Sequence, residues 1–121
     1  MSYPNKVRNF TLISKRQDLS QEEFRRYWTE VHAPIAQRLP GLIGYVQHHV
    51  VDTGARGDFP APPADVDGIV ELIFESRAAM DAALSGPVGE ELVEDARNFQ
   101  SQMRKYIVED VVIVPEEDTN E

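Results

Sequence analysis

Apolar residues cluster in four short segments of the chain that are rich in β-branched and aromatic side chains, a composition typical of β-strands. These segments are Val7–Ser14, Leu42–Asp52, Val66–Ser76 and Lys105–Val114. Residues that favour turns separate them, and Pro115 ends the last segment. The sequence therefore predicts four strands.

Between the first two strands, apolar residues recur at intervals of four, three and four, which is the spacing of one helical face. This stripe consists of Phe24, Trp28, Val31 and Ile35. Ser20 with Glu23 forms a capping box before the stripe, and Leu39–Gly41 should end the helix. Before the last strand, an Ala-rich segment ending at Gly86 and a segment beginning at Pro87 predict further helical structure.

The resulting order is β-α-β-β-α-β, which predicts an α+β, ferredoxin-like fold with one four-stranded antiparallel sheet. In this fold the helices cover a single face of the sheet. All four predicted strands nevertheless carry apolar residues on both faces, as Leu72 and Ile73 illustrate on the third strand. Because monomers rarely expose large apolar faces, we expect a homodimer that pairs the open sheets as a dimeric α/β barrel and encloses a cavity.

The length of 121 residues fits one domain, which we assign to residues 1–115. Residues 116–121 are mostly acidic and lack apolar side chains, so they predict a disordered tail. The long segment Thr53–Ala64 is rich in Pro and Gly and links two strands. We expect it to form a mobile flap over the cavity mouth, with Phe59 covering a substrate.

Charge and composition exclude several classes of function. The net charge of −9, without a Lys/Arg cluster, disfavours nucleic acids and anionic membranes as partners. The absence of cysteine excludes disulfides, thiolate metal sites and thiol nucleophiles, and it suits a cytoplasmic protein. No apolar run has the length of a signal peptide or a membrane span.

His32 is the first candidate for chemistry. It follows Trp28 by four residues and therefore shares its helical face, on the flank of the apolar stripe. Pro34 has no N–H, so the carbonyl of Glu30 loses its helical partner and the backbone can bend. We expect the bend to turn His32 toward a cleft; the alternative is a boundary histidine that caps the helix end.

Polar residues on two strands supply further candidates. Tyr45, Gln47 and His49 alternate and so share one strand face. On the third strand Asp67 and Glu71 also share a face, and we expect both to enter the same cavity as His49, where a carboxylate beside an imidazole favours proton transfer. The alternative for Glu71 is a solvent-facing residue paired with a cross-strand Arg or Lys.

Asp95 and Phe99 lie four residues apart, hence on one helical face. They are candidates to line the cavity. The alternative is that Phe99 belongs to the core and that Asp95 is a solvated acid or a helix cap.

Together, "EEFRRYWTEVHAPIAQRLPGLIGYVQHHVV", "DGIVELIFES", "EDARNF" and "VEDVVIV" resemble the EthD domain family. This group lies within the dimeric α/β-barrel superfamily, which includes methylmuconolactone methylisomerase and fungal polyketide-tailoring enzymes. The resemblance spans about Val7–Val114. It implies a ferredoxin-like protomer, a homodimer and a cofactor-free pocket between sheet and helices.

The resemblance also marks His32 as the motif histidine. It extends to Tyr45, His49, Glu71, Asp95 and Phe99. At His48 the chain departs from the asparagine that such proteins often show, and we assign His48 no role. Family members differ in substrate, so the resemblance leaves the reaction open.

The first functional hypothesis is a cofactor-independent isomerase, lyase or cyclase acting on a small lactone, phenolic or polyketide-like carbonyl compound. His32 or His49 would abstract a proton beside the carbonyl, Glu71 or Asp95 would orient the imidazole, and Tyr45 would donate to the enolate oxygen. The candidates for substrate contact are Trp28, Tyr45, Gln47, Asp67, Asp95 and Phe99.

Two alternatives come from other classes. His32, His49 and Glu71 are a two-histidine, one-carboxylate set that a metal enzyme could use, although their spacing matches no compact metal motif. The chain could also be a non-catalytic module that binds a small molecule or assists a neighbouring enzyme.

Overall fold

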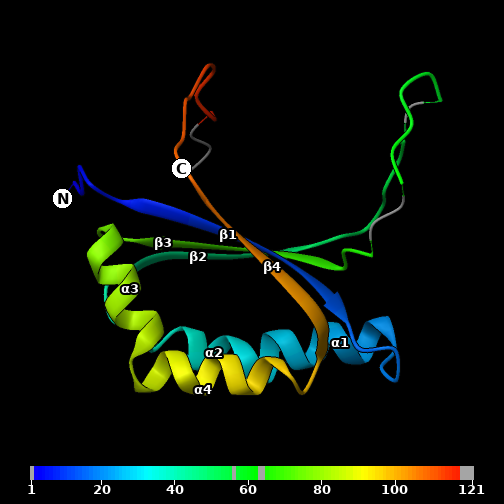
Figure 1. Ribbon diagram of the computed structural model, residues 1–121, viewed down its shortest axis with the longest axis horizontal. Helices are drawn as coiled ribbons and strands as arrows, with labels where there is room; N and C mark the ends of the chain where they lie inside the picture. Colours follow the sequence, from blue (N-terminus) through cyan, green and yellow to red (C-terminus); the bar gives the residue numbers. More distant parts are fainter. Residues whose placement is uncertain (1, 56, 63–64, 118–121) are drawn as a thin grey trace.

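The computed structural model describes residues 2–55, 57–62 and 65–117. Its elements are β1 (Val7–Lys15), α1 (Gln21–Tyr27), the π-helical turn η1 (Trp28–His32), α2 (Ala33–Ala36), β2 (Leu42–His49), β3 (Gly68–Phe74), α3 (Arg77–Ser85), α4 (Pro87–Ala96) and β4 (Gln100–Val108). The strands form one antiparallel sheet in the order β2-β3-β1-β4. Helices α1, α2 and α4 lie along one side of it (Figure 1). The predicted ferredoxin-like α+β fold is confirmed.

The last strand begins and ends earlier than the sequence predicted. β4 runs from Gln100 to Val108 instead of over Lys105–Val114. Val108 pairs with Arg8, one residue from the start of β1, so β1 offers almost no backbone beyond this point for further pairing. The apolar run Val111–Val114, on which the predicted strand was based, lies outside the sheet with exposed fractions of 68–84%.

The first helix begins where the capping box predicted. The Ser20 hydroxyl accepts a hydrogen bond from the Glu23 N–H at 3.0 Å, and the Ser20 N–H donates to the Glu23 carboxylate at 2.8 Å. Phe24 and Trp28 of the predicted apolar stripe are fully buried, whereas Val31 is 43% exposed, so the stripe is confirmed only in part. Local capping and long-range packing thus agree on the helix position.

The bend expected near Pro34 takes the form of the π-helical turn. The N–H of Ala33 bonds to the carbonyl of Trp28, five residues earlier. Pro34 cannot donate a hydrogen bond to the carbonyl of Glu30, so this stretch lacks one of its ordinary helical bonds. The wide turn holds Trp28 and His32 on the sheet side of the helix, where both are buried.

The core between sheet and helices consists of two clusters. One is built from Ile13, Phe24, Trp28 and Phe99. The other is built from Leu39, Leu72, Phe74, Met80 and Ala83. Val70 packs against both clusters, and Gly68 allows the close approach of Trp28, since an added Cβ would lie 2.5 Å from the indole ring.

Within the described residues, the opposite face of the sheet carries no helix. Phe10 and Leu12 alternate with the buried Asn9, Thr11 and Ile13 and therefore point to this open face. Ile69 and Ile73 do so on β3, and Val46 on β2 and Tyr106 on β4 are 43% and 46% exposed. The described part of the chain thus presents an apolar sheet face that none of its own elements covers.

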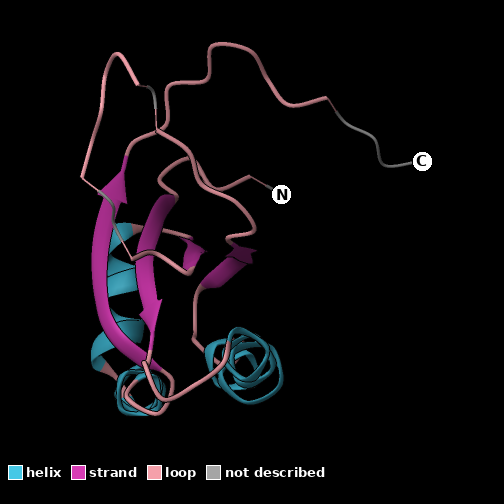
Figure 2. Ribbon diagram, turned by 90° about the vertical axis from the view of Figure 1, so that its right-hand side faces the viewer, coloured by secondary structure: helices cyan, strands magenta, loops and turns pink. Residues whose placement is uncertain are grey.

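Two segments run to the side of the molecule away from α1, α2 and α4 in both views (Figures 1 and 2). They are the connection between β2 and β3 and the segment after β4. None of the described residues of Thr53–Ala64 lines the cavity that contains His32, and Phe59 is 78% exposed. This segment therefore does not cover the His32 cavity of its own chain, and a flap over a cavity enclosed by two chains stays a prediction; residues 56, 63 and 64 lie outside the described part.

Candidate active site

A cavity of about 210 Å³ lies between the sheet and the helices, where the two core clusters meet. Its lining is mostly apolar: Ile13, Val70, Leu72, Leu84, Leu92, Val93, Ala96 and Met103. The polar residues in its wall are Asn9, Thr11, His32, Gln100 and Lys105. An apolar cavity with a few convergent polar groups is the usual form of a small-molecule site, and this volume indicates a small ligand, since such sites span about 300–1,000 Å³.

His32 is placed in this cavity wall by the π-helical turn and is 7% exposed. Its Nδ1 lies 2.8 Å from Oδ2 of Asp95 on α4. A carboxylate only accepts hydrogen bonds, so Nδ1 carries the proton and Nε2 of the neutral ring has a free lone pair. Among the described residues Nε2 has no hydrogen-bond partner. The arrangement suits a general base.

Asp95 is itself held by three donors. The Tyr27 hydroxyl donates to its Oδ1 at 2.6 Å and the Asn98 amide at 3.2 Å, while His32 donates to Oδ2. Burial alone would raise the pKa of Asp95, but these hydrogen bonds lower it below its ordinary value. The carboxylate therefore stays ionised and fixes the tautomer of His32.

Burial lowers the pKa of His32 below its ordinary value, and the hydrogen bond and charge of Asp95 oppose this effect without cancelling it. The ring also packs on Phe99, with ring centroids 4.7 Å apart. His32 is consequently neutral near pH 7, the form that accepts a proton. Phe99 is fully buried in the core, so it supports His32 and does not line the cavity.

The polar residues of β2 form a separate group beside Trp28. The Gln47 amide donates to the Trp28 carbonyl at 3.0 Å and to the Tyr45 hydroxyl at 2.8 Å. Nε2 of His49 lies 3.1 Å from Oε1 of Gln47. The His49 ring also stacks on the Trp28 indole, with ring centroids 4.5 Å apart. Burial raises the pKa of Tyr45, while burial and the charge of Arg25 lower the pKa of His49. None of these residues lines the His32 cavity.

Glu71 does not join His49, contrary to the expectation from sequence. It lies on the open face of the sheet, where His48 Nε2 is 2.8 Å from its carboxylate and Arg8 forms an ion pair with it. The physical reason is strand alternation: His49 faces the helices, and the neighbouring His48 shares the face of Glu71. The Arg partner of the alternative is present, as Arg8 on the neighbouring strand, but Glu71 is not solvent-facing, because its side chain is only 14% exposed.

Asp67 likewise lies outside the cavity. Its carboxylate accepts hydrogen bonds from the backbone N–H of Lys15 at 2.8 Å and from the Gln21 side chain at 2.7 Å. These bonds connect the end of β1 to the start of α1, which is a structural role.

The possible metal set of His32, His49 and Glu71 is not assembled. Glu71 and His49 point to opposite faces of the sheet, and His32 bonds to Asp95 instead. Within residues 2–55, 57–62 and 65–117, no group of three or more His, Asp or Glu side chains is arranged to hold a metal ion.

Sequence reasoning did not find the remaining polar residues at the site. Asn9 and Thr11 alternate on β1 and signal a polar strand face, but only the fold shows that this face meets the helices. Lys105 was expected at the start of a strand and lies well inside β4. Tyr27, one residue before Trp28, is distinguished only by its contact with Asp95.

Comparison with known proteins supports this fold. A family model, EthD domain, matches residues 16–102. An EthD family protein from Bacillus halodurans C-125 superposes with a TM-score of 0.70 at 18% identity, covering 88% of this chain and 99% of that one. SnoaB from Streptomyces nogalater, described as a cofactor-independent oxygenase, gives a TM-score of 0.66 at 14% identity and 93% and 99% coverage.

A third solved structure, a dimeric protein of unknown function with a ferredoxin-like fold from Bacteroides fragilis NCTC 9343, gives a TM-score of 0.63 at 8% identity, with 89% and 99% coverage. No curated protein matches the sequence significantly. Within the described residues, none of the helices has the length and apolarity needed to cross a membrane.

Proposed function

Because this chain belongs to the EthD domain family, we propose that it is a small-molecule enzyme that uses His32 as a general base. The reaction is an isomerisation, elimination or cyclisation of a small lactone, phenolic or polyketide-like carbonyl compound. The observation that carries the proposal is the His32–Asp95 pair in the wall of a mostly apolar cavity. Among the three histidines, only His32 lines this cavity, so His32 takes the role in preference to His49.

In the proposed step, Nε2 of His32 removes a proton from the carbon beside the carbonyl. The electron pair of the C–H bond forms a C=C bond, and the π pair of the C=O bond moves onto the oxygen, which gives an enolate. Asp95 stabilises the imidazolium ion that forms and keeps the ring in place. His32 then returns the proton to another carbon, giving an isomer, or to a leaving group, giving elimination. The chain's own groups account for every proton in this sequence.

The test uses α-angelica lactone, a small lactone that isomerises to its conjugated form by loss of a proton at C3 and gain of one at C5. We expect saturable isomerisation, followed by ultraviolet absorbance, that falls about 100-fold or more in His32→Gln. Deuterium uptake by 2-tetralone in D₂O, followed by NMR, extends the test to a bicyclic ketone.

A matched control is His48→Gln, which alters a histidine on the opposite face of the sheet and should leave both rates unchanged. If both compounds bind and the rates with wild type and His32→Gln are equal, the alternative of a non-catalytic binding module is favoured. If neither compound reacts or binds, the proposal fails for lactones and ketones of this size.

We also propose that the protein acts as a homodimer whose open sheet faces pack together. The support is the apolar face made by Phe10, Leu12, Ile69 and Ile73, which no element of the chain covers within its described residues. The ferredoxin-like protein from Bacteroides fragilis is described as dimeric.

A further inference from the structure

Asn9 and Thr11 are polar residues buried in the sheet wall of the cavity, with exposed fractions of 2% and 7%. The Thr11 hydroxyl donates to Oδ1 of Asn9 at 2.9 Å, which fixes the orientation of the amide. Among the described residues, the only partner of the Asn9 Nδ2 group is the sulfur of Met80 at 3.9 Å. A thioether is a weak acceptor, so this buried donor is poorly satisfied.

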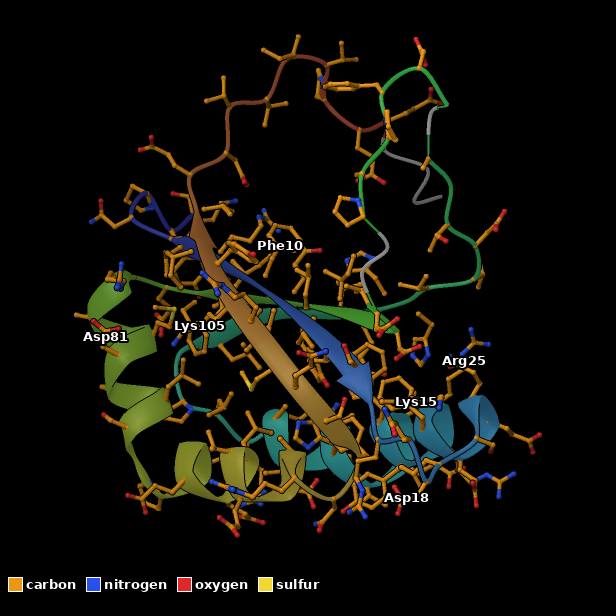
Figure 3. The ribbon with its side chains drawn as sticks, turned by 45° about the vertical axis from the view of Figure 1, so that its right-hand side comes forward. Phe10, Lys15, Asp18, Arg25, Asp81 and Lys105 are labelled. Carbon is orange, nitrogen blue, oxygen red and sulfur yellow. The ribbon has the colours of Figure 1, made fainter. Side chains whose placement is uncertain are left out.

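Lys105 brings a positive charge to the same wall. It pairs with Thr11 across β1 and β4, and its side chain lies on the side of the sheet that carries α4 (Figure 3). No described residue forms an ion pair or hydrogen bond with its ammonium group. In a chain of net charge −9, it is the one Lys or Arg among the described residues that line this cavity.

Sheet geometry places these two residues on the same face of the sheet, as near neighbours on adjacent strands. Asn9 is two residues from Thr11 on the same strand face, so Asn9 and Lys105 are diagonal neighbours, about 7–8 Å apart at the backbone. A lysine side chain spans that separation. An oxygen between them would receive an N–H from the amide and the charge of the ammonium group.

We propose that Asn9 and Lys105 form an oxyanion site in the His32 cavity, so that the substrate is an enolisable carbonyl compound whose carbonyl oxygen binds between them. The inference rests on the proposed function, because the negative oxygen arises when His32 takes the proton. The Asn9 amide is fixed in advance by Thr11, whereas Lys105 is an exposed residue whose ammonium group is free to reach the ligand oxygen. A donor that is fixed before the charge develops stabilises that charge strongly. This assignment transfers to Asn9 and Lys105 the role that sequence reasoning gave to Tyr45, whose hydroxyl bonds to Gln47 outside the cavity.

The experiment measures whether the cavity prefers an oxyanion, with 4-nitrophenol as the probe, since its anion is coloured. Absorbance titration of the probe with wild-type protein should show that binding lowers the pKa of the phenol by about one unit or more, a tenfold preference for the phenolate. Asn9→Leu and Lys105→Met should each remove most of this shift. Thermal melting of both variants verifies that they fold.

Two matched controls separate the site from other charges. Lys15→Met removes a lysine of β1 that does not line the cavity, and it should keep the full shift. His32→Gln should also keep most of it, which excludes proton transfer from the phenol to His32 as its source. No binding at millimolar probe, binding without preference for the anion, or an equal loss of the shift in Lys15→Met overturns the inference.

The outcomes remain distinct from those of the lactone test. If isomerisation requires His32 but binding does not favour the phenolate, the oxyanion site is contradicted and the role of His32 as a base is supported. If the phenolate preference requires Asn9 and Lys105 but neither the lactone nor the ketone reacts, an anion-binding cavity is supported and the proposed reaction is contradicted.

Discussion

His32 is a buried histidine on whose pKa burial and a carboxylate partner act in opposite directions. Burial is the larger effect, so the pKa lies below the ordinary value of about 6.5. We expect an NMR titration of the ring to give a midpoint below 6.5. Asp95→Asn should lower the midpoint further, because it removes the charge and the hydrogen bond that raise the pKa. A midpoint that rises in Asp95→Asn would contradict this assignment.

The same pKa shift predicts how stability depends on pH. Below about pH 6.5 the unfolded chain takes up a proton on His32 more readily than the folded chain does. The free energy of unfolding should therefore fall as the pH drops from about 6.5 toward the folded pKa. The lowered pKa of Asp95 adds a second loss in more acidic solution, as that carboxylate is protonated. His49 also has a lowered pKa and contributes a loss over the same pH range. Urea denaturation over a pH series should therefore show a smaller loss in His32→Gln than in wild type.

Replacing His32 by alanine separates a catalytic from a structural role. Asp95 keeps its bonds to Tyr27 and Asn98, so the stability cost should be about 1 kcal/mol. Turnover of α-angelica lactone should fall about 100-fold or more. A large loss of stability with unchanged turnover would instead identify His32 as a structural cap of the helix and move the search for a base to His49.

At the scale of elements, local signals in the sequence determined much of the fold. The capping box at Ser20, the first part of the helical stripe and the order of elements along the chain depend on neighbouring residues, and the structure confirms them. Strand ends and strand faces were less predictable. β4 ends at Val108 because β1 offers almost no backbone for pairing beyond Arg8. Which face of β2 meets the helices depends on the pairing of the whole sheet. That is why Glu71 was assigned to the wrong side.

The candidate site follows the same division. His32 was found because Trp28, Pro34 and the helical phase are all local, and its partner Asp95 was among the candidates. Asn9 and Lys105 were not found, since their importance depends on which face of the sheet the helices cover. From sequence alone, a polar residue on a strand is assigned to the solvent face, because polar residues are mostly exposed. Only the fold shows that a helix covers it.

The contact between β3 and the π-helical turn gives a prediction at this scale. A Cβ on Gly68 would lie 2.5 Å from the Trp28 ring, whereas nothing lies within 4 Å of the same position at Gly54. Gly68→Ala should therefore lower the free energy of unfolding by about 1–3 kcal/mol, and Gly54→Ala should change it by less than about 0.5 kcal/mol. Urea midpoints measure both, and equal effects would contradict the close packing.

At the scale of the whole molecule, the open sheet face and the exposed run Val111–Val114 are apolar surface that no described element of the chain covers. We expect light scattering to give the mass of a dimer at micromolar concentration. Phe10→Asp and Ile73→Asp, which place a charge on that face, should shift the mass toward the monomer. A monomer mass for wild type would contradict the dimer.

Two truncations of the carboxyl end separate its acidic part from its apolar part. Residues 116–121, of which 118–121 lie outside the described part, have no apolar side chain and carry like charges that repel one another. A chain ending at Pro115 should keep the melting temperature and mass of wild type. A chain ending at Asp110 also loses Val111–Val114, which packs against neither of the two core clusters that the described residues form. If a partner covers this run, the second truncation should weaken the dimer and lower its melting temperature, while the first leaves both unchanged.

Two outcomes would contradict these expectations. Loss of the dimer in the first truncation would show that the acidic tail docks. An intact dimer in the second truncation would show that Val111–Val114 takes no part in association.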